Sequence, residues 1–414
     1  MSNWQTKKLG EVADVKLSNV DKKTKPDERV VRLCNYTDVY KNSFINSDKV
    51  EDFMIASCNE NEFEKFVLKK GQVAITKDSE KRDDIGISTY ISENFDDVVL
   101  GYHLSLITPY ENELDGRFLH YWFNTKQAKT YFENNAGGSG QRCTLPIDII
   151  KSVPLKLPDF PTQQKIASIL SALDDKIELN NKINDNLEQQ AKTLYDYWFV
   201  QNANPKWEIV TLNNFIKSDK SGDWGKEEGQ GNYITRVECI RGADINGIIG
   251  KGEMKTPTRF ILEKNRNKIL SENDLVIEIS GGSPTQSTGR LAYITTEVLE
   301  RFENPLICSN FCKAISLNNP NELFYFVYSW NKAYENNVFF GFEGKTSGIK
   351  NLLFETLVST YSIVKPDEKT LIEFQKVIST LEKQRQKNLQ QNQQLSQLRD
   401  WLLPMLMNGQ VKVE

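Results

Sequence analysis

Two long stretches of this chain repeat one another about 208 residues apart, and each has the spacing of a helix that buries one seam. Along 162–199 and again along 371–407, seam residues recur at steps that alternate between four and three. This is the a/d spacing of a coiled coil. The matching seam positions are Ile166, Leu170, Leu173, Ile177, Asn180, Asn184, Leu187, Leu194 and Trp198 in the first copy and Phe374, Ile378, Leu381, Arg385, Asn388, Asn392, Leu395, Leu402 and Leu406 in the second. Such a repeat indicates two copies of one unit, which suits a target with two halves.

The two helices predict each other as packing partners. Each would be about 57–60 Å long, and an isolated helix needs a partner to bury its seam. Antiparallel pairing about residue 182 places Asn180 beside Asn392 and Asn184 beside Asn388. A buried Asn lowers stability but fixes register, because a slip leaves its amide unpaired. We therefore predict a polar central layer of these four residues; the alternative is that they face solvent.

Strand-forming runs precede each helix and also repeat. Runs rich in β-branched and aromatic residues occur at 30–36, 71–77 and 98–108, and the last two have counterparts at 270–280 and 305–316. The Gly-rich loop 136–143 has its counterpart in the second half at 341–348. The predicted fold class is α+β: two strand-rich domains joined by two long helices that pack as an antiparallel coiled coil, with a pseudo-twofold internal repeat. The expected boundaries are 1–158 and 204–365 for the strand-rich domains and 159–203 and 366–414 for the helical regions.

Composition narrows the function classes. The net charge is −4, which argues against indiscriminate binding of polyanions. No stretch approaches the roughly 18 apolar residues of a membrane helix, and the first ten residues lack the apolar core of a signal peptide. The six Cys are scattered, which suits a reducing cytoplasm, and no metal site is expected. We therefore expect a cytoplasmic protein without a membrane partner.

Catalytic motifs are not recognisable in this chain. It has two His, and no ordered Ser/His/Asp set stands out. The run 341–347 ends like a phosphate-binding loop, but Phe339 occupies the place of its first Gly. The Asn-Pro-Pro-aromatic tetrapeptide of amino-methyltransferases is absent. We expect no catalytic residues in this chain.

Several turn-rich loops concentrate residues that reach nucleic acids. Arg pairs with guanine and Gln or Asn with adenine, while Ser, Thr and Lys hold phosphates. Polar loops of this kind are also common without any ligand. The candidate DNA-binding residues are Arg32, Lys77, Ser79, Lys81, Arg82, Ser139, Gln141, Arg142, Arg236, Arg241, Ser283, Thr285, Gln286, Ser287, Arg290, Lys345, Thr346, Ser347 and Lys350.

The layout resembles the specificity subunit of type I restriction–modification systems. The features that carry the resemblance are the Trp-x4-Leu opening of each half, GGSGQR (137–142) leading into VPLKLPDFPTQQKIASILSALDDKIELNN, LYDYWF (194–199) and WLLPMLMNGQV (401–411). The resemblance covers essentially the whole chain, twice. It is less regular in the second half, where 346–366 replaces a cleaner first copy at 138–158.

The resemblance implies a division of labour. Each strand-rich domain would read half of a split, asymmetric DNA site, and the paired helices would set the gap. Two methyltransferase subunits and motor-nuclease subunits would be the protein partners, and double-stranded DNA the target. S-adenosylmethionine, Mg and ATP would belong to those partners, with no cofactor in this chain. One alternative is a non-enzymatic coiled-coil scaffold or receptor-binding protein with duplicated β-rich heads; another is a fused enzyme, against which the missing motifs argue.

Overall fold

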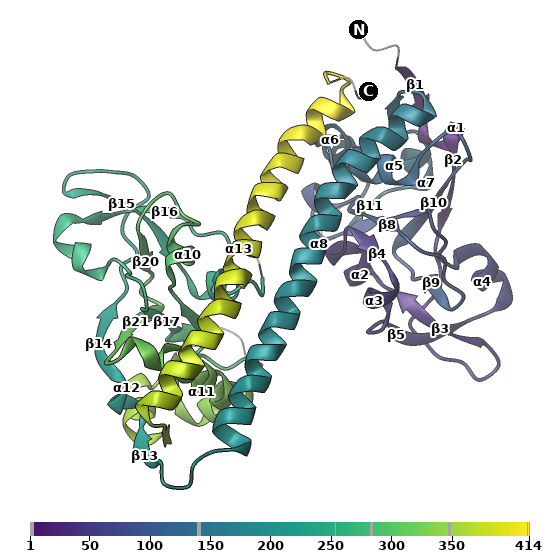
Figure 1. The fold of residues 1–414 in the computed structure, drawn as a ribbon. Helices are drawn as coiled ribbons and strands as arrows, with labels where there is room; N and C mark the ends of the chain where they lie inside the picture. Colours follow the sequence, from purple (N-terminus) through teal and green to yellow (C-terminus); the bar gives the residue numbers. More distant parts are fainter. Residues whose placement is uncertain are drawn as a thin grey trace. The chain divides into compact units, whose positions relative to one another are not determined.

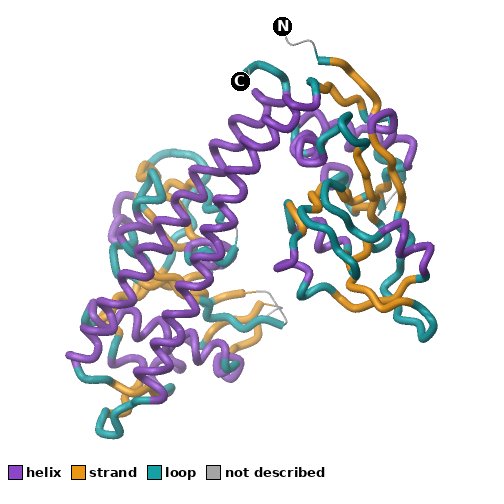
Figure 2. The backbone as a smooth tube through the Cα atoms, turned by 45° about the vertical axis from the view of Figure 1, so that its right-hand side comes forward, coloured by secondary structure: helices purple, strands orange, loops and turns teal. Residues whose placement is uncertain are grey.

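The chain folds into two compact units, each of which combines a strand-rich part with portions of both long helices. The computed structural model describes residues 4–138, 142–252, 254–281, 285–346, 349–411 and 413. Unit 1 comprises residues 1–176 and 395–414, and unit 2 comprises residues 177–394. Figure 1 follows the chain through both units, and in Figure 2 the strands gather in the strand-rich parts. The predicted α+β class, with two strand-rich parts and two long helices, is confirmed.

The long helices are α8 (Phe160–Asp196) and α13 (Glu368–Met407), and a short π-helix (Tyr197–Gln201) follows α8. Their N-termini are capped in the same way. The carboxylate of Asp159 accepts from the backbone N–H of Thr162 at 2.9 Å, and that of Asp367 accepts from Thr370 at 3.0 Å. The sequence favours Thr162 as the first cap, but Asp159 takes this role because its carboxylate reaches an otherwise unpaired N–H.

Within unit 2, the facing portions of α8 and α13 run antiparallel and bond through asparagines. The amide of Asn180 donates to Oδ1 of Asn392 at 2.8 Å, and the amide of Asn388 donates to Oδ1 of Asn184 at 2.8 Å. Asn180, Asn184 and Asn388 are buried. The pairs therefore lie in the helix contact rather than in solvent. In unit 1, α8 and α13 contact through Arg399, whose guanidinium donates to Asp174 at 2.7 Å.

Unit 1 contains two main sheets. A five-stranded sheet has the order β2-β10-β6-β8-β4, and a three-stranded sheet has the order β5-β3-β9 with β3 parallel to β9. Two further pairs, β1-β12 and β11-β7, complete the strands. The strands are β1 (Gln5–Lys8), β2 (Ala13–Leu17), β3 (Arg29–Cys34), β4 (Phe44–Ile45), β5 (Met54–Cys58), β6 (Val73–Thr76), β7 (Asp78–Ser79), β8 (Ser88–Ile91), β9 (Val98–Leu100), β10 (Leu104–Pro109), β11 (Cys143–Thr144) and β12 (Pro154–Leu157). The helices are α1 (Leu9–Val12), α2 (Tyr36–Lys41), α3 (Ser47–Val50), α4 (Glu60–Phe66), α5 (Gly116–Phe123), α6 (Lys126–Asn135) and α7 (Ile147–Lys151).

Unit 2 repeats this topology. Its four-stranded sheet β14-β21-β17-β19 matches β2-β10-β6-β8, and its sheet β16-β15-β20 matches β5-β3-β9, again with one parallel pair. The pair β13-β24 matches β1-β12, while β18-β23-β22 extends β7-β11 by one strand. The strands are β13 (Glu208–Thr211), β14 (Ile216–Ser221), β15 (Tyr233–Ile240), β16 (Thr258–Leu262), β17 (Leu275–Glu278), β18 (Ser280–Gly281), β19 (Leu291–Tyr293), β20 (Leu306–Cys308), β21 (Cys312–Leu317), β22 (Glu343–Thr346), β23 (Ile349–Leu352) and β24 (Ser362–Lys365). The helices are α9 (Ile245–Ile248), α10 (Thr296–Leu299), α11 (Leu323–Glu335) and α12 (Phe354–Thr360).

Each core is closed by a helix that lies between the sheet and the long helices. In unit 1, Phe118 and Trp122 of α5 share one apolar cluster with Ile166 and Leu170 of α8. In unit 2, residues of α11 such as Phe326 cluster with Phe374 of α13. Burial of this apolar surface fixes the sheet against the helix and so positions the loops at the strand ends.

Candidate nucleic-acid interface

Five candidates of the first half lie where β6, β7 and β11 meet: Lys77, Ser79, Lys81, Arg82 and Arg142. Here a cavity of about 670 Å³ is lined by Tyr36, Tyr40, Asp78, Ser79, Glu80, Lys81, Asp84, His103 and Arg142. Three of these nine, Ser79, Lys81 and Arg142, are sequence candidates. Strand pairing brings them together, because Cys143 of β11 lies opposite Ser79 of β7. Cationic and aromatic side chains around one opening suit contact with bases and phosphates.

A chain of hydrogen bonds orients Arg142. His103 contacts the Asp78 carboxylate through Nδ1 at 2.6 Å, and Arg142 Nη2 lies 3.0 Å from Nε2 of the same ring. The carboxylate favours the proton on Nδ1, so Nε2 accepts from Arg142. Burial opposes ionisation of Asp78, but hydrogen bonds from Thr144, His103 and Lys77 outweigh it and lower the pKa of Asp78. The exposed guanidinium of Arg142 is therefore aimed by a fixed anion behind it.

The remaining basic candidates of this loop edge differ in their partners. Lys77 pairs with Asp78 at 3.0 Å, and the Ser79 hydroxyl accepts from the backbone of Lys81 at 3.2 Å. Lys81 and Arg82 are exposed, and Arg82 donates to the Gly138 carbonyl at 3.3 Å. Within the described part of the chain, neither Lys81 nor Arg82 has a carboxylate partner. Both are therefore available to phosphates.

Arg32 lies on β3 and is already engaged. Its Nε and Nη2 donate to the two carboxylate oxygens of Asp97 at 2.9 Å each, and Nη1 donates to the Val50 carbonyl at 3.3 Å. This bidentate pair uses the edge of the guanidinium that would face a guanine. A structural role for Arg32 accounts for these contacts.

In unit 2 the candidate loop packs around two buried glutamates. Arg290 donates to Glu278 through Nε and Nη2 at 2.8 and 2.7 Å. The Ser287 hydroxyl donates to Glu343 at 3.1 Å, and Lys350 lies 3.2 Å from the other oxygen of the same carboxylate. Burial opposes ionisation of Glu343, but these bonds and one from the Thr288 backbone lower its pKa. The candidates are brought together here, although their charges are largely paired.

The other second-half candidates lie on and beside β15. Arg236, on β15, is exposed and has no ion-pair partner among the described residues. Arg241, just after β15, donates to Asp244 at 2.8 and 3.0 Å and to the Lys255 carbonyl at 2.7 Å. Thr285 and Gln286 belong to the loop between β18 and β19, and the backbone of Gln286 accepts from Lys350 at 3.4 Å. The candidates Ser139, Gln141, Ser283 and Ser347 lie outside the described residues, as do the side chains of Lys345 and Thr346, which belong to β22.

Sequence reasoning missed the acidic and aromatic members of these loop edges. Asp78 and His103 organise the first edge, and Glu278 and Glu343 organise the second. His103 also has a left-handed backbone with φ of 69°, which is uncommon for a residue other than glycine and marks a constrained position. The alignment of 98–109 with 305–316 gave no direct signal, because it sets His103 opposite Asn310, one residue before the exposed Phe311.

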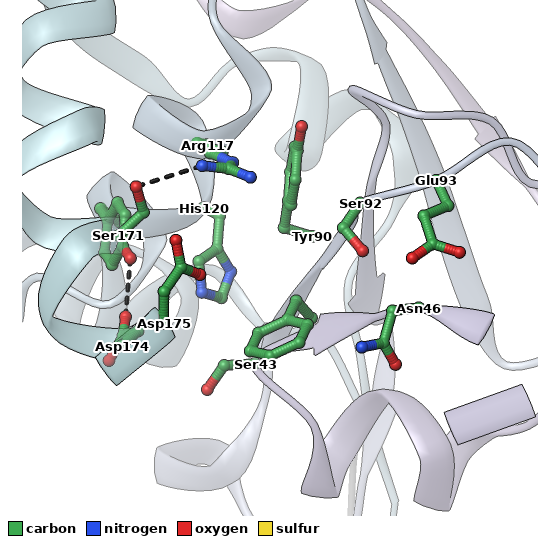
Figure 3. Close-up of a pocket in the computed structure, with 12 residues that line it drawn as sticks. Ser43, Asn46, Tyr90, Ser92, Glu93, Arg117, His120, Ser171, Asp174 and Asp175 are labelled. Carbon is green, nitrogen blue, oxygen red and sulfur yellow. Dashed lines mark hydrogen bonds between the residues drawn. The ribbon is translucent and has the colours of Figure 1, made fainter. Parts of the chain in front are cut away.

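A second cavity of unit 1 lies where the strand-rich part meets α8 (Figure 3). Its volume is about 280 Å³, and Arg117, Ser171 and Asp175 line it. Arg117 donates to Ser171 at 3.1 Å, and the Tyr121 hydroxyl donates to Asp174 at 2.6 Å. These bonds tie α5 to α8.

The matching place in unit 2 is filled by a buried ionic cluster. Tyr293 and Tyr328 both bond Glu382 of α13, and Arg385 donates to that carboxylate at 2.7 and 2.9 Å. Burial acts against the charge on Arg385, but the groups around it raise its pKa overall. Unit 2 thus holds its long helix through charge.

Among the described residues, no group of three or more His, Cys, Asp or Glu could hold a metal ion. The six cysteines are free and buried, and burial raises the pKa of the Cys58 thiol to about 11 and that of Cys308 to about 12. No described helix is both long and apolar enough to cross a membrane.

A duplicated α+β unit on two long helices is a known architecture. A crystal structure of the type I restriction–modification S subunit from M. genitalium has this fold, with a TM-score of 0.58 and 17% identity over 98% of this chain and 96% of that one. Residues 1–189 match the family described as "Type I restriction modification DNA specificity domain". The chain is therefore similar to type I restriction–modification specificity subunits, and the family match covers its residues 1–189.

Two curated relatives carry that description. The chain is 32% identical over 203 residues to the HindI specificity subunit of Haemophilus influenzae, a match that covers 48% of this chain and 41% of that subunit. It is 26% identical over 316 residues to the MjaIX specificity subunit of Methanocaldococcus jannaschii, covering 72% of this chain and 69% of the relative. The match thus spans less than half the length of the first relative.

Proposed function

We propose that this chain binds DNA sequence-specifically as the specificity subunit of a type I restriction–modification complex. The observation that carries the proposal is the loop edge of unit 1, where Lys81 and Arg142 line a cavity and have no carboxylate paired to them among the described residues. Lysine and arginine neutralise phosphates, and a positioned arginine reads guanine through two hydrogen bonds. The Asp78–His103 pair would hold Arg142 ready for such a contact.

Each unit would read one half of a bipartite, asymmetric site. The matched topology gives both units a loop edge at the same strand ends, while the side chains there differ. In this proposal the segments 1–158 and 204–365 are the two target-recognition domains. The helical regions 159–203 and 366–414 set the gap between half-sites, and their asparagine pairs fix the helix register in unit 2.

The chemistry would reside in partner subunits. The two curated relatives are specificity subunits of type I restriction enzymes. We propose that two methyltransferase subunits dock on the helices, that motor-nuclease subunits join them, and that S-adenosylmethionine, Mg and ATP bind in those partners. The chain itself would be non-catalytic and would act in the cytoplasm.

Salt dependence tests the proposal. The log affinity of a DNA reader falls with log salt concentration by about 0.9 for each phosphate contacted. We expect such a slope for the complex of this chain with its methyltransferase subunit on a duplex that carries both half-sites. Methylation sequencing of a host with both subunits identifies that duplex. A scaffold or receptor-binding protein would show neither a salt slope nor a methylated bipartite site, and that result would reject the proposal.

A further inference from the structure

The strand registers define which residues of the two units occupy equivalent places at the loop edges. Leu104 of β10 pairs with Thr76 of β6, and Cys312 of β21 pairs with Glu278 of β17. Three residues separate β9 from β10, and three separate β20 from β21, so His103 corresponds to Phe311. The backbone agrees, because Lys77 N–H donates to the His103 carbonyl at 3.1 Å and Ile279 N–H donates to the Phe311 carbonyl at 2.9 Å.

A second equivalent pair follows from the next strands. Thr144 of β11 pairs with Asp78 of β7, and Asn351 of β23 pairs with Ser280 of β18. Two residues before Thr144 and Asn351 lie Arg142 and Ile349, which therefore occupy equivalent positions. The bond from Leu145 N–H to the Lys77 carbonyl at 2.7 Å has its counterpart in the bond from Leu352 N–H to the Ile279 carbonyl at 2.9 Å. One backbone frame therefore presents two positions in each unit.

The side chains at these positions differ in kind. In unit 1 they form a polar pair, with Arg142 Nη2 3.0 Å from the His103 ring. In unit 2 they are Phe311 and Ile349, which are 55% and 43% exposed. Large apolar side chains exposed at both positions do not help the core, which suggests that they meet a partner.

We propose that these two positions determine base specificity in both half-sites, and that the apolar pair of unit 2 recognises the C5-methyl group of a thymine. The inference rests on the proposed DNA-reading function. In the major groove, thymine is the base that presents a methyl group, and Phe is among the side chains that contact it. The polar pair of unit 1 takes a guanine instead, because an arginine fork matches O6 and N7. A shared frame with exchanged chemistry is how two domains of one fold read different bases.

The test removes one methyl group from the DNA. The bipartite site of the complex of this chain with its methyltransferase subunit is first read by methylation sequencing, and each thymine of the second half-site is then replaced by deoxyuracil. At one thymine we expect roughly fourfold weaker binding by the wild-type complex, in line with loss of one buried methyl-sized group. Phe311→Ala should bind the thymine and deoxyuracil duplexes equally. Because Phe311 is exposed, this variant should fold normally.

Matched variants complete the design. Ile209 is 75% exposed on β13 of the same unit, so Ile209→Ala should keep the full thymine preference. The double variant Phe311→His, Ile349→Arg should shift that base position towards guanine and leave the first half-site unchanged. If the wild-type complex binds its bipartite site but no thymine replacement acts through Phe311, the inference is overturned and the proposed function stands. If the complex has no bipartite site, both fall.

Discussion

The loop edge of unit 1 leaves basic side chains exposed without carboxylate partners in the described chain, whereas the matching edge of unit 2 pairs its basic side chains with buried glutamates. Lys81 and Arg82 are free of such partners. Arg290 and Lys350 instead contact Glu278 and Glu343, whose side chains are 7% and 6% exposed. Electrostatic contact with phosphates therefore favours unit 1, and unit 2 must rely more on shape and apolar contact.

Where each strand-rich part meets the long helices, the paired charges are more deeply buried in unit 2 than in unit 1. Unit 2 fills this junction with Glu382, Arg385 and two tyrosines, while unit 1 has a cavity beside Asp175. Asp174 of unit 1 still bonds a tyrosine and an arginine, but that arginine is partly exposed. The comparison shows that one topology accepts either a buried ionic cluster or an open one at the same place.

The largest expected effect comes from breaking the buried cluster of unit 2. Arg385→Met leaves Glu382, with 1% of its side chain exposed, without its cation. Removing one partner of a buried pair costs about 3–5 kcal/mol, and we expect that loss of unfolding free energy in urea denaturation. Asp174→Asn in unit 1 should lose roughly 1 kcal/mol, because Arg399 can turn to water.

The double variant Arg385→Met, Glu382→Leu is the control. Removing both charges should restore most of the stability, since an apolar pair can replace a buried ion pair at little cost. Equal losses from Arg385→Met and Asp174→Asn would remove the contrast between the two junctions.

Acid should affect unit 1 more than unit 2, because the buried His120 belongs to unit 1. Burial lowers the pKa of His120 to about 4, while Asp174 raises it by less and Arg399 lowers it slightly further. The unfolded chain takes up this proton near pH 6.5, so the fold loses stability as pH falls from about 6.5 towards 4. The full loss is roughly 3 kcal/mol at 1.36 kcal/mol for each pH unit.

Hydrogen exchange resolves this effect by unit. Protection of peptides from α5 and β8 should fall between pH 6.5 and 4.5, while that of peptides from α11 and β19 should change less. His120→Gln removes the titrating group and should flatten the response of unit 1. A parallel decline in both units, unaffected by this substitution, would assign the acid sensitivity to carboxylates instead.

Two arginines separate the reading edge from the structural one. Arg142 is exposed, so Arg142→Ala should weaken DNA binding by roughly 1–3 kcal/mol and relax the first half-site, with the preference of the second unchanged. Arg290→Ala should chiefly destabilise unit 2, because it leaves Glu278 buried and unpaired. Quantitative binding selections and urea denaturation distinguish the two effects. Relaxed preference at both half-sites after Arg142→Ala would contradict the proposal that each unit recognises its own half-site.

The helices and strands could be predicted from the sequence because each has a pattern of residue types that extends over many positions. Seam residues at steps of three and four predict that Asn180 faces Asn392, and the two side chains form a hydrogen bond of 2.8 Å. A seam repeated over many turns leaves little freedom in register. The α+β class follows from the runs of β-branched and aromatic residues before each helix.

The loop edges were only partly accessible. The sequence alignment matches 341–348 with 136–143. The strand registers shift this match by two residues, so that Arg142 corresponds to Ile349. Gly-rich loops have no period that would reveal such a shift. The carboxylates that neutralise Arg32 and Lys350 are equally hidden, because Asp97 lies just before β9 and Glu343 on β22, and their contacts depend on strand pairing.

A smaller effect than that of Arg385→Met is expected from the asparagine pairs of unit 2, which bond α8 to α13 as the Asp174–Arg399 ion pair does in unit 1. Asn388→Leu leaves the buried Asn184 without its donor and should cost about 1–3 kcal/mol in urea denaturation. Asn184→Leu, Asn388→Leu together should recover most of this, because neither side chain then needs a hydrogen bond. Asn186→Leu, at an exposed position of α8, should change stability by less than about 0.5 kcal/mol. If the double variant is as unstable as the single one, the pair contributes through more than its hydrogen bond; if the single variant is neutral, the layer does not hold the register.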